Sequence, residues 1–237
     1  MHLFHFLKNL SKTFLMPYLI ANVMVHALGK IFIQPIIKLW LRKVEGTENI
    51  PKYKPFIIAS NHSSYYETLL LPSIIIPVVN KTIHAFVNSY YWKPIITRVF
   101  LKLWDQIPVY VDKEKDSKEK NKKSMNKAIS YLKKNELLMI FPEGKRSSDG
   151  KLQKAYHGIA RLALKAKTPV LPCGIIGANK VLPKGKTFPR FTRCEVRIGK
   201  PMHFEKFYNR KDEKAYEQVT RSIMKEIAKL IGQEYNY

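Results

Sequence analysis

A short apolar run, followed at once by a polar stretch and a second apolar run, constrains the fold most. Residues 55–59 read Pro-Phe-Ile-Ile-Ala, a β-rich segment opened by proline, which predicts a buried strand of an α/β sheet. Residues 60–67 are polar or aromatic, and residues 68–71 (Thr-Leu-Leu-Leu) predict the first turns of a helix. The polar stretch would therefore lie at the carboxyl end of a strand, where open α/β sheets bind their ligands.

The polar stretch carries a histidine and an acid five residues apart, His62 and Glu67. Across a strand-to-helix turn, the carboxylate can accept a hydrogen bond from one ring nitrogen and leave the other free to take a proton. This predicts a general base that acts on a hydroxyl of the substrate, without a serine or cysteine nucleophile. The alternative is that His62 caps a helix and Glu67 is a solvated acid in its first turn. A metal site is not indicated, because no third ligand stands at a useful spacing.

A second strand-like run, residues 137–141, ends in the segment Pro-Glu-Gly-Lys-Arg-Ser at residues 142–147. Asn61-His62 followed by an acid resembles the first motif of the glycerolipid acyltransferase superfamily, which includes the lysophosphatidic acid acyltransferases. The Phe-Pro-Glu-Gly segment with its Arg and Ser is similar to the third motif of that family. The two motifs occur in the family's order, within a match from about Val44 to Pro201, and their joint presence is far more specific than either alone.

This resemblance implies catalysis by His62 and Glu67. It implies that Arg146 and Lys145 hold a glycerol phosphate head group by charge-assisted hydrogen bonds, while Glu143 accepts a hydrogen bond from a hydroxyl. The substrate-binding residues expected on this basis are Asn61, Glu143, Gly144, Lys145, Arg146 and Ser147. No cofactor or metal is expected; acyl-CoA or acyl carrier protein would be the co-substrate.

The expected activity is transfer of a fatty acyl group from such a thioester to the free hydroxyl of a lysolipid, with 1-acylglycerol 3-phosphate as the first choice of acceptor. The chain departs from the family pattern in having Glu67 in place of Asp and Lys145 in place of Thr. Between the motifs, Asp105 replaces a glycine and Val111 a basic residue. Asn88 stands near the position of a usual lysine, so another lysophospholipid or an amino-lipid is the alternative acceptor.

The chain is strongly basic, with 42 Lys and Arg against 18 Asp and Glu and a formal net charge of +24. Such an excess attracts phosphate-rich surfaces, either nucleic acid or an anionic membrane. We expect membrane lipids as partners and no nucleic acid, because no zinc-ligand cluster and no recognisable nucleic-acid motif is present. A non-catalytic basic protein that binds membranes or nucleic acid is the alternative of another class.

Residues 1–43 are expected to form a membrane-associating helical segment, and residues 44–237 the acyltransferase domain. Thr13 to Gly29 contains no acid, lysine or arginine, but about 17 residues of helix span roughly 26 Å, short of a hydrocarbon core of about 30 Å. We therefore expect an embedded amphipathic helix and a second membrane-facing segment at residues 31–41, with Trp40 at the headgroup boundary. A single transmembrane helix is the alternative; a signal peptide is disfavoured because no cleavage site clearly ends the run.

The two cysteines, Cys173 and Cys194, lie in strand-like segments, which predicts small core residues rather than a disulfide framework. A reducing location follows, so we expect a membrane-associated protein whose catalytic domain faces the cytoplasm.

The predicted fold is a single α/β domain with a mixed, mostly parallel sheet flanked by helices. His84 is expected to be structural, and the apolar residues of 90–103 to pack in the core, with an acyl channel or lipid contact as the alternative. Residues 112–123 predict a solvated loop that runs into a helix, and residues 180–193 a membrane-contact loop. Further strands are predicted at 82–87, 169–177 and, at an edge, 194–199; further helices at 68–76, 125–134, 157–167 and 212–231.

Overall fold

The computed structural model describes residues 34–111 and 114–237. Its strands are β1 (Leu41–Glu45), β2 (Ile57–Ser60), β3 (Ile83–Asn88), β4 (Ile107–Val109), β5 (Leu137–Ile140), β6 (Val170–Ile176) and β7 (Cys194–Ile198). Its α-helices are α2 (Gln34–Lys38), α3 (Glu67–Val79), α4 (Ile95–Leu103), α5 (Ser117–Lys133), α6 (Gly158–Ala166), α7 (Ala178–Val181) and α8 (Glu213–Ile231). Short 3-10 turns occur at η2 (Thr47–Asn49), η3 (Ser89–Trp92) and η4 (Glu205–Phe207).

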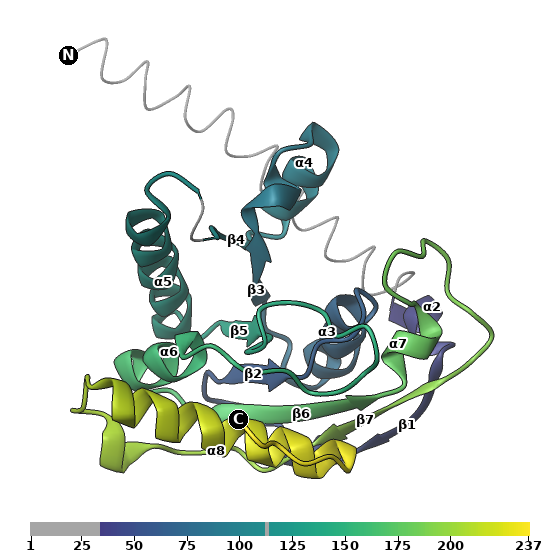
Figure 1. The fold of residues 1–237 in the computed structure, drawn as a ribbon. Helices are drawn as coiled ribbons and strands as arrows, with labels where there is room; N and C mark the ends of the chain where they lie inside the picture. Colours follow the sequence, from purple (N-terminus) through teal and green to yellow (C-terminus); the bar gives the residue numbers. More distant parts are fainter. Residues whose placement is uncertain (1–33, 112–113) are drawn as a thin grey trace.

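The strands form a seven-stranded sheet in the order β1-β7-β6-β2-β5-β3-β4 (Figure 1). Every neighbouring pair is parallel except β6 and β7, which pair antiparallel. Five strands therefore run one way and β7 and β1 run the other. This confirms the predicted mixed, mostly parallel sheet flanked by helices.

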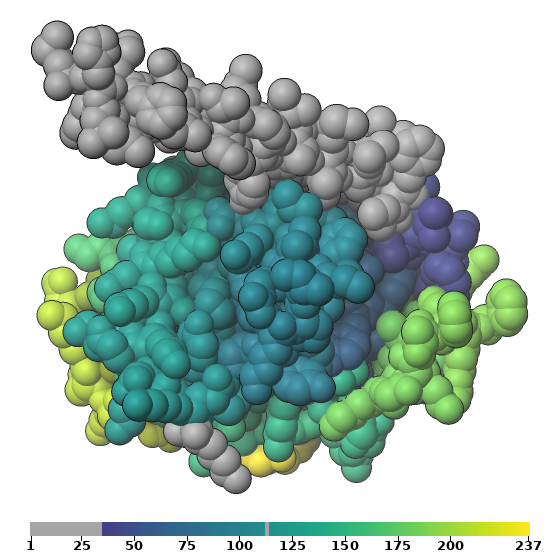
Figure 2. All heavy atoms as spheres, turned by 90° about the horizontal axis from the view of Figure 1, so that it is seen from above, coloured from purple at the N-terminus to yellow at the C-terminus, as the bar shows by residue number. Residues whose placement is uncertain are grey.

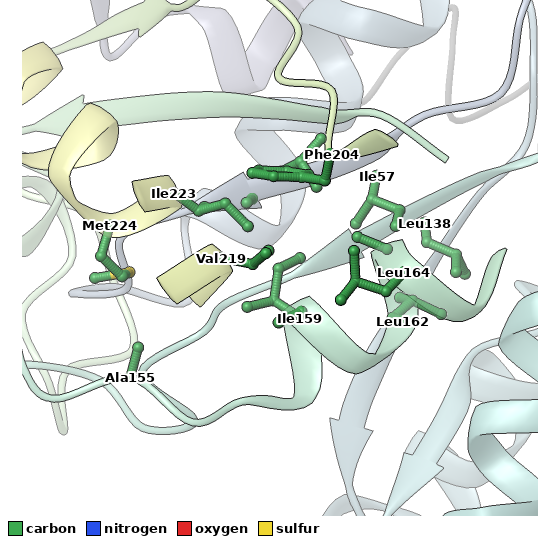
Figure 3. Close-up of a cluster of buried hydrophobic side chains, with 14 of the residues drawn as sticks. Ile57, Leu138, Ala155, Ile159, Leu162, Leu164, Phe204, Val219, Ile223 and Met224 are labelled. Atoms are coloured by element: carbon green, nitrogen blue, oxygen red, sulfur yellow. The ribbon is translucent and has the colours of Figure 1, made fainter. Parts of the chain in front are cut away.

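Strand β2 lies in the middle of the sheet because every one of its side chains is apolar or small enough to be buried on both faces. Successive side chains of a strand point to opposite faces. Ile57 and Ala59 join one buried cluster with residues of α5, α6 and α8, part of which Figure 3 shows around Ile159 and Val219. Ile58 joins a second cluster with residues of α3 and α7. The sheet is thus covered by helices on both faces, and its central strand leads directly to the polar loop.

Strand β7 corrects the prediction of an edge strand at residues 194–199. It lies between β6 and β1, and β1 supplies the edge. The alternating pattern of β7, buried at Cys194, Val196 and Ile198, is compatible with an inner position because Glu195 and Arg197 make ion pairs with β1. Strand β1 begins at Leu41, so it crosses the boundary expected between residues 43 and 44.

The expected membrane-associating segment lies mostly outside the described residues, because residues 1–33 are not among them. Of its last part, Ile36 and Leu39 are exposed, whereas Ile37 and Trp40 pack against the second cluster. The indole nitrogen of Trp40 donates to the carbonyl of Arg190 at 3.0 Å, so this side chain, expected at the headgroup boundary, contacts protein. Within residues 34–111 and 114–237, no helix has both the length and the apolar character needed to cross a bilayer.

Helix α4 corrects the expectation that residues 90–103 pack in the core, since none of its residues is buried. Four of its apolar side chains are about half exposed or more: Ile95, Ile96, Val99 and Phe100. Seen from above, the blue-teal segment that contains α4 occupies the centre of the visible face, with the green loop before β7 to its right (Figure 2). An apolar helix face is therefore exposed on this side of the domain.

His84 has a structural environment, as predicted. Its ring is buried, stacks on Tyr131 at 3.7 Å between centroids, and hydrogen-bonds the Asp105 carbonyl and the Glu136 carboxylate. Asp105 has a positive φ of 48°, which explains why a glycine is usual there in the resembled family. Cys173 and Cys194 are free and buried, which confirms them as core residues.

Candidate active site

Two loops meet at one edge of the sheet because they follow neighbouring parallel strands. β2 pairs in parallel with β5, with Ile58 opposite Met139, and the carboxyl ends of parallel strands lie at the same edge. We call residues 61–67, after β2, the histidine loop, and residues 141–147, after β5, the cationic loop. The sequence therefore brings both motifs together simply by placing each after a buried strand.

The histidine loop pairs His62 with Glu67 as predicted. The Nδ1 atom of His62 lies 2.8 Å from Oε2 of Glu67. A carboxylate can only accept, so Nδ1 carries the hydrogen and Nε2 keeps its lone pair. The extra methylene of glutamate, compared with the aspartate usual in the resembled family, does not prevent the contact. The His62 side chain is 13% exposed, so the ring is held by protein and still reaches solvent.

Glu67 is the first residue of α3 and is fully buried, at 0% exposure. Its carboxylate also accepts from the backbone N–H of Ser63, at 2.9 and 3.0 Å to its two oxygens, and from the Ser63 hydroxyl at 2.7 Å. These contacts hold the carboxylate against the helix start, where the helix dipole favours negative charge. The alternative of a solvated first-turn acid is therefore wrong.

Phe141, the first residue of the cationic loop, lies flat against the His62 ring. The ring centroids are 3.9 Å apart and the planes differ by 14°. With Glu67 on its Nδ1 edge and Phe141 on one face, the imidazole has little freedom to rotate. Phe141 is a site residue that the sequence interpretation left without a role, although its place at the head of the third motif was a signal.

Glu143 holds the backbone of the histidine loop instead of facing solvent. It is 1% exposed, and it accepts from the backbone N–H of His62 at 2.8 Å and of Gln153 at 2.7 Å. Burial raises the pKa of the Glu143 carboxyl to about 7, a shift that the two amide donors oppose and the nearby Glu67 reinforces. These contacts differ from the expected hydrogen bond from a substrate hydroxyl, because the carboxyl is buried and each of its oxygens accepts from the protein backbone.

Ser147 completes this clamp from the other end of the cationic loop. Its backbone N–H donates to the carbonyl of His62 at 2.8 Å, and its hydroxyl donates to Asp149 at 2.8 Å while accepting from Gly150 N–H at 3.0 Å. Ser147 is buried. The cationic loop thus binds both backbone groups of His62, and Ser147 serves the loop's own structure in place of the expected substrate contact.

Asn61 also differs from the expected substrate-binding role. Its side chain is buried and makes a two-way pair with the backbone of Ile175 in β6, donating to its carbonyl at 2.9 Å and accepting from its N–H at 2.8 Å. The amide of Asn61 ties the histidine loop to the strand on the other side of β2. Asparagine is needed there because donor and acceptor must stand side by side.

Gly144, Lys145 and Arg146 are the predicted binding residues that remain accessible. Gly144 has φ +68°, and its N–H closes a turn on the carbonyl of Phe141 at 3.0 Å. This confirms the predicted tight turn. Lys145 is exposed, and the guanidinium of Arg146 lies over the Tyr65 ring, 3.5 Å from its centroid. The turn therefore presents two cations beside the histidine loop.

Tyr65 is a second site residue to which the sequence interpretation gave no role. It belongs to the histidine loop yet supports Arg146 of the cationic loop, and it meets Tyr91 edge-on at 5.8 Å between centroids. Stacking on an aromatic face restricts a guanidinium to one plane and leaves its edge donors free. Only the tertiary contact between the loops reveals this pairing.

The arrangement combines an oriented imidazole with adjacent cations, which suits proton removal from a hydroxyl next to a phosphate. In the part of the chain that the structure describes, no group of three or more His, Cys, Asp or Glu side chains is placed to hold a metal ion.

Comparison with known proteins shows which family the chain belongs to. The family model described as Acyltransferase matches residues 41–176, more than half of the chain. A 1-acyl-sn-glycerol-3-phosphate acyltransferase from Pseudomonas aeruginosa is 32% identical over 165 residues, which cover 69% of this chain and 60% of that protein. The Bacillus subtilis protein of the same name is 26% identical over 188 residues, which cover 79% of this chain and 87% of that protein.

A third relative, the chloroplastic 1-acyl-sn-glycerol-3-phosphate acyltransferase LPAT1 from Arabidopsis thaliana, is 28% identical, with 47% of its length matched. The matched part of the chain therefore covers from about half to most of the length of these relatives. The crystal structure of the 1-acyl-sn-glycerophosphate acyltransferase from Thermotoga maritima has the same fold, with a TM-score of 0.61 at 22% identity over 96% of this chain and 94% of that one.

Proposed function

Because the chain belongs to the acyltransferase family, we propose that it transfers a fatty acyl group from an acyl thioester to the free hydroxyl of a lysolipid. The observation that carries this proposal is the His62–Glu67 pair, 2.8 Å apart, beside a turn that presents Lys145 and Arg146. The acceptor we propose is 1-acylglycerol 3-phosphate. The names of the matched relatives support it, as do the two cations, which suit a phosphate dianion.

In the proposed reaction, Nε2 of His62 removes the proton of the acceptor hydroxyl as its oxygen attacks the thioester carbonyl. The carbon–oxygen bond forms and the carbon–sulfur bond breaks. The departing thiolate then takes the proton from His62, so the imidazole returns to its starting state. Glu67 keeps the hydrogen on Nδ1 and stabilises the transient imidazolium, while Arg146 and Lys145 hold the phosphate.

The donor would be acyl-CoA or acyl carrier protein, and no cofactor enters the proposed reaction. We also propose that the protein works at a membrane with its catalytic domain on the cytoplasmic side. The net charge of +24 favours an anionic lipid surface, since each basic residue near such a surface contributes about 1 kcal/mol. The exposed apolar face of α4 supports the same proposal.

The test is a panel of lysolipids, each offered to purified protein with one labelled acyl thioester, while free thiol and labelled product are measured. We expect thiol release that depends on 1-acylglycerol 3-phosphate, with a labelled diacyl product. The matched controls are 1-acylglycerol, which lacks the phosphate, and a lysophospholipid whose phosphate carries a further head group.

A greater kcat/KM for the second control would replace the proposed acceptor with another lysophospholipid. Failure of every acceptor to release thiol above the rate seen without acceptor would reject transferase activity. The chain would then be treated as a basic membrane-binding protein.

A further inference from the structure

A cavity of about 460 Å³ lies outside the two loops, lined by residues of α4, α5 and the segment around β4. It is formed where α5 packs along β4, with the Ser124 hydroxyl donating to the carbonyl of Pro108 at 2.6 Å. No residue of the histidine or cationic loop lines it. Its lining residues are Trp92, Lys102, Asp105, Gln106, Pro108, Tyr110, Lys120, Lys123, Ser124 and Lys127.

The cavity has a surplus of positive charge. Four lysines and one aspartate line it, so basic side chains outnumber acidic ones four to one in its wall. The carboxylate of Asp105 is itself 2.9 Å from Nζ of Lys127. Lysines from two elements, Lys102 of α4 and Lys123 of α5, face one hollow, which would concentrate an anionic ligand bearing more than one phosphate group.

Aromatic side chains supply the remaining wall. Trp92 and Tyr110 line the cavity, and Nζ of Lys120 lies 5.2 Å from the centroid of the Tyr110 ring. Flat apolar surfaces next to cations are the features that bind a heterocyclic base together with its phosphates. A carrier protein would need a docking surface of about 800 Å² on each partner, whereas ten residues line this cavity, so its extent fits a small molecule better.

The cavity is connected to the catalytic edge through one aromatic segment. Trp92 is followed back along the chain by Tyr91, whose ring meets Tyr65 of the histidine loop at 5.8 Å. In the sheet, β4 is three strands from β2, which is about 14 Å at the usual strand spacing. A ligand that is phosphorylated at one end and carries its thioester on a long flexible arm could occupy both places at once.

We propose that this cavity binds the phosphorylated nucleotide end of acyl-CoA. The inference rests on the proposed function and makes it more specific, because it selects acyl-CoA over acyl carrier protein as the donor. The lysines would hold the phosphates, and Trp92 or Tyr110 would stack on the adenine. The arm would then run past Tyr91 towards His62.

The first experiment measures the donor KM for the double variant Lys102→Glu/Lys123→Glu, with Lys122→Glu as the matched control. Lys122 is exposed on the same helix but does not line the cavity. Reversing two charges should raise the KM for acyl-CoA about tenfold or more, because attraction becomes repulsion. The KM for the lysolipid, the kcat and the transfer from an S-acyl pantetheine, which lacks the nucleotide, should stay at the wild-type values.

A second experiment uses adenosine 3′,5′-bisphosphate alone, titrated calorimetrically into wild-type protein and both variants. We expect binding to the wild type and to Lys122→Glu, and loss of binding in the double variant. This readout does not require catalysis, so it separates the cavity from the proposed function. Circular dichroism of each variant verifies folding, and single Lys123→Glu replaces the double variant if that one unfolds.

The proposal is overturned if the double variant keeps the wild-type KM for acyl-CoA while transfer proceeds, a result that leaves the proposed function standing. It is also overturned if the substitutions raise the KM for acyl carrier protein but not for acyl-CoA, which would make this surface a carrier-protein contact. A third outcome separates the two proposals. If the nucleotide binds to the wild type and not to the double variant, but the protein transfers no acyl group, the nucleotide site stands and the proposed function is rejected.

Discussion

Two buried glutamates, Glu67 and Glu143, lie in neighbouring loops and have different hydrogen-bond partners. Glu67 accepts a hydrogen bond from a side chain that faces solvent, the His62 ring, as well as from Ser63. Among the described residues, Glu143 accepts from two backbone amides, those of His62 and Gln153. One carboxylate sets the protonation state of the imidazole; the other sets where its backbone lies.

The difference shows that belonging to a catalytic motif does not place a residue against substrate. The cationic loop contributes an accessible part, Lys145 and Arg146, and a buried part, Glu143 and Ser147, that holds the histidine loop by hydrogen bonds. A buried acceptor that has no partner costs about 1–3 kcal/mol, so such clamps are retained for reasons of structure. Four substitutions can test this division of roles.

The largest effect is expected for His62→Ala. Removal of a positioned general base should lower kcat by about 10²–10⁴. The variant should still fold, because the backbone contacts of the loop remain, but with a lower thermal stability, because the stacking on Phe141 and the hydrogen bond to Glu67 are lost. The measurement is initial-rate kinetics of thiol release, with His203→Ala, an exposed histidine outside both loops, as control. Wild-type turnover in the folded variant would remove His62 from the mechanism.

Glu67→Gln should lower kcat by roughly 10². The amide group can donate to Nδ1, which favours the ring tautomer with hydrogen on Nε2, and that nitrogen can no longer accept a proton. Glu67→Asp is the matched control because it keeps the charge and shortens the reach. Wild-type kcat in Glu67→Gln would mean that the carboxylate does not set the tautomer, and a loss confined to Glu67→Asp would mean that side-chain length matters and the charge does not.

Glu143→Gln should lower kcat by roughly tenfold, because an amide can accept one of the two backbone hydrogen bonds but repels the other donor and shifts the histidine loop. The acceptor KM should change little if Glu143 does not touch substrate. A large rise in acceptor KM with unchanged kcat would restore the substrate-binding role that the motif suggested.

The same variant has a predicted pH signature in stability. The pKa of Glu143 is raised from an ordinary 4.5 to about 7, so between these values the folded protein holds a proton that the unfolded chain has released. Its contribution to the free energy of unfolding therefore falls as pH rises from about 4.5 to about 7, and is constant above. Glu143→Gln lacks this change. Urea unfolding of both proteins should show that the free energy of unfolding of the wild type falls relative to that of Glu143→Gln as the pH rises across that range. A difference that does not change with pH would mean that the carboxyl is not buried as described.

The smallest effect is expected for Tyr65→Leu. Loss of the aromatic face under Arg146 removes a cation–π contact of about 0.5–1 kcal/mol, which corresponds to a two- to fivefold rise in acceptor KM. Tyr65→Phe keeps the face and should behave as wild type. If Tyr65→Phe and Tyr65→Leu raise the acceptor KM equally, the hydroxyl of Tyr65 supports acceptor binding and the stacking on Arg146 does not.

Much of the fold could be predicted locally. The apolar run before His62 specifies a strand buried on both faces, and the 3.6-residue spacing of Val219, Ile223 and Ile227 specifies a terminal helix whose apolar stripe meets the sheet. The place of β7 could not be predicted, because alternation indicates a half-buried strand and does not say which neighbours it has. The exposed face of α4 was missed for a related reason: an amphipathic pattern shows that a face is apolar, not that the protein covers it.

The chain itself determined the identity and order of the reactive groups: a histidine and an acid five residues apart after one buried strand, and two cations after another. Those facts are local, because hydrophobic runs and short spacings are read within a few residues. Tertiary structure alone decided that Glu143 and Asn61 face backbone amides, that Tyr65 carries Arg146, and that lysines of α4 and α5 share one cavity. Each of these depends on contacts between segments distant in the chain, which the packing of the sheet and its helices brings within bonding distance.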